Sequence, residues 1–185
     1  MDLEDLKGHW KIMRKELDAL PRNVFISDNE REDYQDFVSV GKCGWLKGEN
    51  AHVQDGCISW PFYWESRPIL SNCAKCPETF KLLSQIPGIS IAAFNLMKGG
   101  VQLEEHTDPS GPNYRFTYHL GLKCPDDCYL HHWNMGAIKE EDGKHITLNT
   151  KYPHWAENKS KEDRVILYIE ICHPDQTKCS TFNTI

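Results

Sequence analysis

The segment His106-Thr107-Asp108 places an imidazole and a carboxylate two positions apart. In an extended chain, residues i and i+2 point to the same side with Cα atoms about 6–7 Å apart, so both side chains can close on one ion. A third ligand must come from another element, and His154, in the sequence KYPHW, is the best placed. Two histidines and one carboxylate on one face of an ion leave its other positions open, which suits Fe(II) in an oxygenase. We therefore predict that His106, Asp108 and His154 are the metal ligands and the catalytic residues.

The other histidines offer a weaker alternative. The chain has nine histidines, and His131-His132 is the rival pair. Neighbouring residues of a strand point to opposite faces, so these two side chains are poorly placed to share one ion.

Arg164 follows His154 by ten residues and begins an apolar segment. A 2-oxoglutarate cosubstrate chelates a metal through its keto acid end, and its distal carboxylate needs a cation a few ångströms deeper. The planar fork of arginine meets a carboxylate with two parallel hydrogen bonds. The order H-x-D, then H, then R is more specific than any of its parts. It predicts that Arg164 binds the cosubstrate.

The apolar pattern predicts the elements that position these side chains. Helical segments show apolar residues at spacings of three and four, whereas the later segments alternate with a period of two and are separated by turns rich in Gly, Pro and Asp. The expected elements, in chain order, are a helix over 3–20, one or two strands in Cys57–Trp64, a helix over 77–86, and strands over Ile89–Met97, 114–123, 145–149 and 164–171. Short strands without helices between them predict an antiparallel sandwich or barrel.

Alternation also sorts side chains into two faces. In the strand over 114–123, His119 lies on a polar face opposite an apolar one, and Arg164 holds the same position in the last strand. On an ordinary sandwich such a polar face lies in water, whereas in a small barrel it lines a lumen that holds a charged ligand. The metal-type residues nearby favour the lumen.

Composition excludes several classes of protein. The 185 residues predict a single domain, and a net charge of −6 argues against binding nucleic acid or an anionic membrane. The longest apolar stretch, Ile89–Met97, is far shorter than the roughly 20 residues of a membrane span. The acidic N-terminus does not resemble a secretory signal, so we expect a cytoplasmic protein.

Eight cysteines leave two readings open. Cys73 and Cys76 have the C-x-x-C spacing of half a zinc site, to which Cys43 and Cys57 would add the other half. Plain buried thiols are the alternative, and the one that we favour. Separately, Cys124 and Cys128 flank a turn and would form a disulfide under oxidation.

Several motifs together resemble the aspartyl/asparaginyl β-hydroxylase family of Fe(II)- and 2-oxoglutarate-dependent dioxygenases. The resemblance covers roughly residues 57–174. The matching segments are CPET at 76–79, IPG at 86–88, FNLM at 94–97, HTD at 106–108, HLGL at 119–122, GK at 143–144, His154, RVILYI at 164–169 and HP at 173–174.

This resemblance implies a double-stranded β-helix, a jelly-roll, cupin-like barrel with N-terminal helices outside it. It implies Fe(II), 2-oxoglutarate and O₂ as cofactors, with the metal on the three ligands named above. It also implies that Asn95, in place of a serine usual in relatives, and His119 help to bind the cosubstrate. Many relatives have an arginine where this chain has Thr117, and Arg115 on the same strand face is the candidate to replace it.

The sequence thus predicts one dioxygenase domain over 1–185. Residues 1–88 are expected to support a barrel core over 89–174, and 175–185 to form a tail. The expected activity is hydroxylation of an aspartyl or asparaginyl side chain in a protein, or of a related small molecule. The alternative is a catalytically weak module on the same barrel that binds a metal or 2-oxoglutarate as a sensor, and the oligomeric state stays open.

Overall fold

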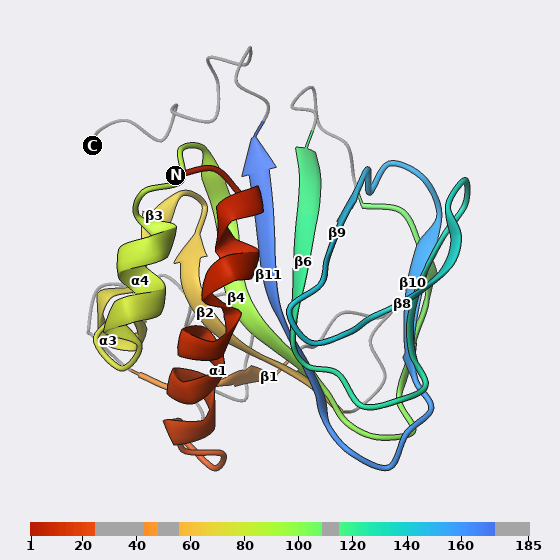
Figure 1. Ribbon diagram of the computed structural model, residues 1–185, viewed down its shortest axis with the longest axis horizontal. Coiled ribbons are helices and arrows are strands. Elements are labelled where there is room, and N and C mark those ends of the chain that lie inside the picture. Colours follow the sequence, from red (N-terminus) through yellow and green to blue (C-terminus); the bar gives the residue numbers. More distant parts are fainter. Residues whose placement is uncertain (25–42, 48–55, 109–114, 173–185) are drawn as a thin grey trace.

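The computed structural model describes residues 1–24, 43–47, 56–108 and 115–172, and at Lys47, Arg115 and Cys172 it describes the backbone alone. Two antiparallel β-sheets face each other, and the helices lie together outside the larger sheet (Figure 1). The helices are η1 (Glu4–His9, a 3₁₀ helix), α1 (Trp10–Ala19), α3 (Leu70–Cys73) and α4 (Pro77–Leu83).

The larger sheet has the strand order β1-β2-β4-β11-β6-β9, with β3 paired to β2, and the smaller sheet has the order β5-β10-β7-β8. The strands of the larger sheet are β1 (Leu46–Lys47), β2 (Cys57–Trp64), β3 (Arg67–Pro68), β4 (Ile89–Met97), β6 (Arg115–Lys123), β9 (His145–Leu148) and β11 (Arg164–Cys172). Those of the smaller sheet are β5 (Gln102–His106), β7 (Cys128–His132), β8 (Gly136–Lys139) and β10 (His154–Asn158).

The order of the strands from β4 to β11 defines the fold. The first and last of them, β4 and β11, are neighbours in the larger sheet, and the next pair inward, β5 and β10, are neighbours in the smaller sheet. The following pair, β6 and β9, returns to the larger sheet, and β7 and β8 pair in the smaller one. This nested alternation is the double-stranded β-helix, or jelly roll. The predicted fold class, mostly β with N-terminal helices, is confirmed.

The outer face of the larger sheet forms the main hydrophobic core. Leu6, Met13 and Leu17 of the N-terminal helices are fully buried in one cluster with apolar residues such as Leu120 of β6 and Leu167 of β11. His119 is next to Leu120, and Arg164 is next to Val165 of the same cluster, so both point to the inside of the barrel, where they too are buried. The polar face of these strands lines a lumen and does not face water.

The predicted helices differ from the observed ones at their ends. The helix expected over 3–20 is a 3₁₀ helix followed by an α-helix, with Gly8, a poor helix former, close to the junction. The helix expected over 77–86 leaves the α conformation after Leu83, where the amides of Gln85 and Ile86 bond three residues back. Of the predicted strand over 114–123, residue 114 lies outside the described residues. None of the described helices is long and apolar enough to cross a membrane.

Candidate metal centre

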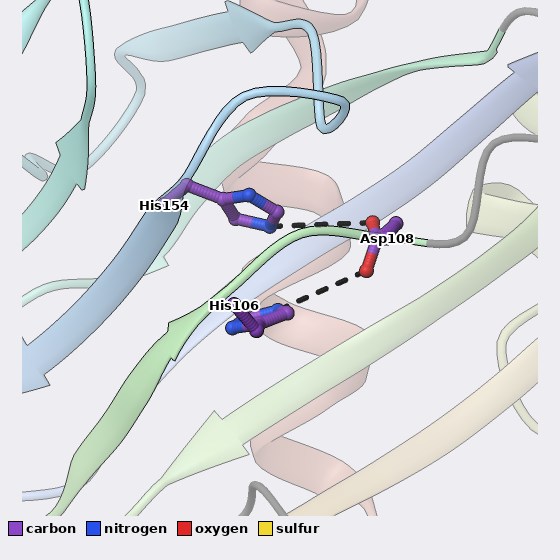
Figure 2. A group of neighbouring side chains, drawn as sticks. All are labelled: His106, Asp108 and His154. Atoms are coloured by element: carbon purple, nitrogen blue, oxygen red, sulfur yellow. Dashed lines mark ion pairs between the residues drawn. The ribbon is translucent and has the colours of Figure 1, made fainter.

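Two neighbouring strands of the smaller sheet bring the predicted ligands together. His106 is the last residue of β5 and His154 the first residue of β10, and the two are directly opposite each other in the ladder. Asp108 follows two positions after His106, and its backbone N–H donates to the carbonyl oxygen of Thr150, 3.0 Å away. As a result, three side chains that are distant in the sequence converge on one point (Figure 2).

The distances suit a single ion. The Nε2 atom of His106 lies 3.8 Å from one oxygen of Asp108, and the Nε2 atom of His154 lies 4.0 Å from the other. One ligand atom from each residue can be chosen so that all lie within 4.8 Å of one another. A set of two imidazole nitrogens and one carboxylate oxygen fits Fe(II) with open positions on the far side.

Backbone carbonyl groups orient both imidazoles. His106 Nδ1 lies 2.8 Å from the carbonyl oxygen of Glu104, and His154 Nδ1 lies 3.0 Å from that of Tyr152. A carbonyl oxygen accepts only, so each Nδ1 carries the proton and each Nε2 presents its lone pair toward Asp108. This is the tautomer that a metal needs, held by the kind of outer hydrogen bond found around metal sites.

The ionisation state of His154 also suits a ligand. Burial lowers the pKa of His154, and the nearby His106 imidazole lowers it further, against the raising effects of the Tyr152 carbonyl and the Asp108 carboxylate. The neutral form is therefore favoured, and only that form binds a metal.

Deeper in the barrel, Arg164 has a partner that the sequence did not predict. Its Nε donates to one carboxylate oxygen of Glu140 at 2.6 Å, and its Nη2 donates to the other. Both side chains are almost completely buried, with Glu140 3% and Arg164 4% exposed. Glu140 directly follows β8, at the start of a Glu-Glu-Asp-Gly run that has the composition of a solvent-exposed turn. The sequence contained no local signal that distinguished it.

His119 links this ion pair to the metal centre. Its Nδ1 lies 3.5 Å from Glu140 Oε1, without the geometry of a hydrogen bond. Burial lowers the pKa of His119, the Glu140 and Asp108 carboxylates oppose this, and Arg164 adds to it. Because both Asp108 and Arg164 act on His119, the metal centre and the ion pair are neighbouring parts of one polar lumen.

The two remaining predicted cosubstrate residues lie at different distances along β11 from Arg164. Asn95 of β4 is opposite Ile166 of β11, and its side-chain oxygen accepts a hydrogen bond of 2.7 Å from Ser59. Arg115 is opposite Cys172 at the far end of β11 from Arg164, so about 26 Å of strand separates the two arginine positions. The side chain of Arg115 lies outside the described residues.

The cysteines do not form the alternative zinc site. Cys43, Cys57, Cys73 and Cys76 are free thiols, and within the described ranges no three metal-binding side chains gather other than His106, Asp108 and His154. Burial raises the pKa of Cys73 to about 12, which keeps this thiol protonated. Cys124 and Cys128 are free as well. The reading of these residues as plain thiols is the one that the structure supports.

Comparison with known proteins identifies the family. The sequence profile described as "Aspartyl/Asparaginyl beta-hydroxylase" matches residues 7–174, and the chain belongs to this family. It is 29% identical over 112 residues to the ornithine lipid ester-linked acyl 2-hydroxylase of Rhizobium tropici. The match covers 56% of this chain and 37% of the relative. It is 30% identical over 115 residues to the mouse aspartate beta-hydroxylase domain-containing protein 2, or 56% of this chain and 32% of the relative. It is 28% identical over 140 residues to the human aspartate beta-hydroxylase domain-containing protein 1, and the match covers 70% of this chain and 35% of the relative. The chain thus spans about a third of the length of these relatives.

Solved structures with a similar fold are remote in sequence. One is a predicted oxalate decarboxylase of Thermotoga maritima, with 11% identity and a TM-score of 0.46 over 69% of this chain and 92% of that one. Another is the cupin domain of Schizosaccharomyces pombe Cnp3, with 10% identity and a TM-score of 0.44. The match covers 67% of this chain and 70% of the Cnp3 domain. The assignment of the fold rests on the strand order described above.

Proposed function

We propose that this chain is an Fe(II)- and 2-oxoglutarate-dependent dioxygenase that hydroxylates a C–H bond of its substrate. The convergence of His106, Asp108 and His154 carries this proposal, because their atoms, tautomers and spacing meet the needs of one divalent ion. Membership of a hydroxylase family supports it. When bound, the iron would supply the O₂ activation that protein side chains do not provide.

Some buried polar atoms of the lumen form no hydrogen bond. Within the described residues, the Oγ1 of Thr117, the Nδ1 of His119 and the Nδ1 of His132 are buried without a hydrogen bond. Buried polar groups are normally paired, so three such atoms at strand positions that face the lumen favour a polar ligand in the barrel. We assign the cosubstrate to this region, with Arg164, His119 and Asn95 as its proposed protein contacts.

A hollow beside the centre offers room for the substrate. It has a volume of about 550 Å³, and its lining includes Phe116, His132 and Tyr152. His132 is directly opposite His154 in the ladder, so one wall of the hollow is adjacent to a candidate ligand. An aspartyl or asparaginyl side chain of a protein, or a related small molecule, is the proposed substrate class. The named acyl 2-hydroxylase relative adds lipid acyl chains to the panel of candidates.

The proposal is tested by measuring succinate formed from 2-oxoglutarate in the presence of Fe(II), O₂ and candidate substrates. The wild type is expected to form succinate, and His154→Ala is expected to form none. His131→Ala is the matched control, because His131 pairs with Glu157 and lies outside the cluster. Tight metal binding without succinate from any member of the panel would instead favour the sensor alternative.

A further inference from the structure

The Glu140 carboxylate binds the guanidinium of Arg164, the group that the proposed cosubstrate needs. Both oxygens of its carboxylate accept hydrogen bonds from Arg164, in the two-bond geometry that a ligand carboxylate would adopt. The pair is almost completely buried, whereas the Asp108 side chain is 39% exposed, and His119 Nδ1 lies 3.5 Å from Glu140 Oε1. The proposed function assigns the distal carboxylate of a metal-chelating 2-oxo acid to this same arginine.

The charges there are already balanced. Arg164 contributes one positive charge and Glu140 one negative charge, and burial favours the neutral form of His119. A second carboxylate entering beside Glu140 would place two like charges at one guanidinium, which is unfavourable in a buried site. The distal carboxylate of 2-oxoglutarate therefore reaches Arg164 only by displacing the Glu140 carboxylate.

The backbone around Glu140 is held in place, so the loop does not carry the carboxylate away. The N–H of Glu140 donates to the carbonyl oxygen of Cys128 at 2.9 Å, and the N–H of Gly143 donates to that of Gly121 at 2.9 Å. A Cβ at Gly121 would lie 2.0 Å from the carbonyl oxygen of Glu141, so the loop packs directly on β6. Release of Arg164 therefore depends on rotation of one of the two side chains and not on movement of the loop.

We infer that Glu140 is an internal competitor for Arg164 that determines which 2-oxo acid the barrel accepts. This inference rests on the proposed function. With Glu140 in place, the distal carboxylate of 2-oxoglutarate brings little affinity, because it gains Arg164 only by displacing another carboxylate. Removal of the Glu140 charge turns the same pocket into a cationic one that selects a dicarboxylate.

The experiment compares two ligands on the full chain loaded with Mn(II), which stands in for iron without turnover. 2-Oxopentanoate has the keto acid end and chain length of 2-oxoglutarate, with a methyl group in place of the distal carboxylate. In the wild type, calorimetric Kd values for the two are expected to lie within about threefold of each other. In Glu140→Gln, the Kd for 2-oxoglutarate is expected to fall at least tenfold, while that for 2-oxopentanoate stays within threefold of wild type.

Two further variants control the result. Glu141→Gln removes the neighbouring exposed carboxylate and is expected to behave as wild type. Glu140→Asp keeps the charge but draws it back by one methylene, and a smaller gain, about threefold, is expected. The wild-type comparison of the two ligands needs no variant, so it tests the inference even where Glu140→Gln does not fold.

Three other outcomes of these binding measurements would overturn the inference. A wild type that prefers 2-oxoglutarate by tenfold or more, with weaker binding in Glu140→Gln, would show that Glu140 orients Arg164 for the cosubstrate. Binding of Mn(II) without binding of either oxo acid in wild type and variants would remove the inference and the cosubstrate part of the proposed function, while the metal centre stands. Absence of Mn(II) binding would remove the proposed function itself, and the inference with it.

Discussion

Replacement of Arg164 by methionine tests the energetics of the buried ion pair independently of any metal. Methionine keeps the length of the side chain but leaves the Glu140 carboxylate, 3% exposed, without its guanidinium. Breaking a buried pair by removing one partner costs about 3–5 kcal/mol, because the remaining charge is desolvated and uncompensated. We expect a loss of unfolding free energy of this size at pH 7.5.

The pKa of Glu140 gives the same magnitude and predicts how it changes with pH. Burial alone would raise the pKa of Glu140, but the charge of Arg164 and the neighbouring His119 lower it from 4.5 to about 2. At 1.36 kcal/mol per pKa unit, this difference corresponds to about 3 kcal/mol. In the wild type this stabilisation is complete above the unfolded-state pKa near 4.5 and is lost as the pH falls toward the folded-state value.

In Arg164→Met the sign reverses. Burial without the guanidinium raises the folded-state pKa of Glu140 above its unfolded-state value, so protonation stabilises the fold as the pH falls. The loss of unfolding free energy relative to wild type is therefore expected to be larger at pH 7.5 than at pH 5. Urea unfolding of wild type, Arg164→Met, Glu140→Gln and the double variant at both pH values measures this. The reasoning fails if this loss is equal at the two pH values, or if the double variant loses the sum of the two single losses.

Three other predictions follow from the geometry. Asp108→Ala is expected to weaken Mn(II) binding at least 100-fold by calorimetry, whereas the affinity of His131→Ala stays within threefold of wild type. Equal affinities of the two variants would show that Asp108 is not a metal ligand. Gly121→Ala places a Cβ 2.0 Å from the carbonyl oxygen of Glu141 and is expected to cost at least about 2 kcal/mol in urea unfolding, and a loss below about 0.5 kcal/mol would contradict this packing. Leu17→Ala removes a fully buried side chain and is expected to cost about 2–5 kcal/mol with Mn(II) affinity unchanged; a parallel loss of affinity would show that the helix layer positions the ligands.

Strand periodicity predicted the larger sheet well and the smaller sheet poorly. The strands β4, β6 and β11 carry long apolar faces because helices cover one side of the larger sheet. The strands of the smaller sheet are short, and β5 reads Gln-Leu-Glu-Glu-His, with little apolar signal. Such segments become strands through pairing with their neighbours, and that pairing depends on closure of the barrel.

The grouping of the candidate metal ligands was predictable because part of its geometry is local. An H-x-D segment in extended conformation has both side chains on one side whatever the fold around it. The choice of His154 rested on sequence order and the resemblance to the family, and the ladder between β5 and β10 confirms that it lies opposite His106. The metal-binding role of the three residues stays a prediction until an ion is measured.

By itself the sequence determined the types of the candidate ligands, the spacing of His106 and Asp108, and the face on which Arg164 lies, because backbone geometry dictates alternation over a few residues. Only the tertiary structure decided which carboxylate meets Arg164. Glu140 reaches it because the connection after β8 folds back onto β6, where Gly121 allows the close approach of Glu141. Contacts of this kind depend on how distant segments pack, and no local pattern of residues encodes them.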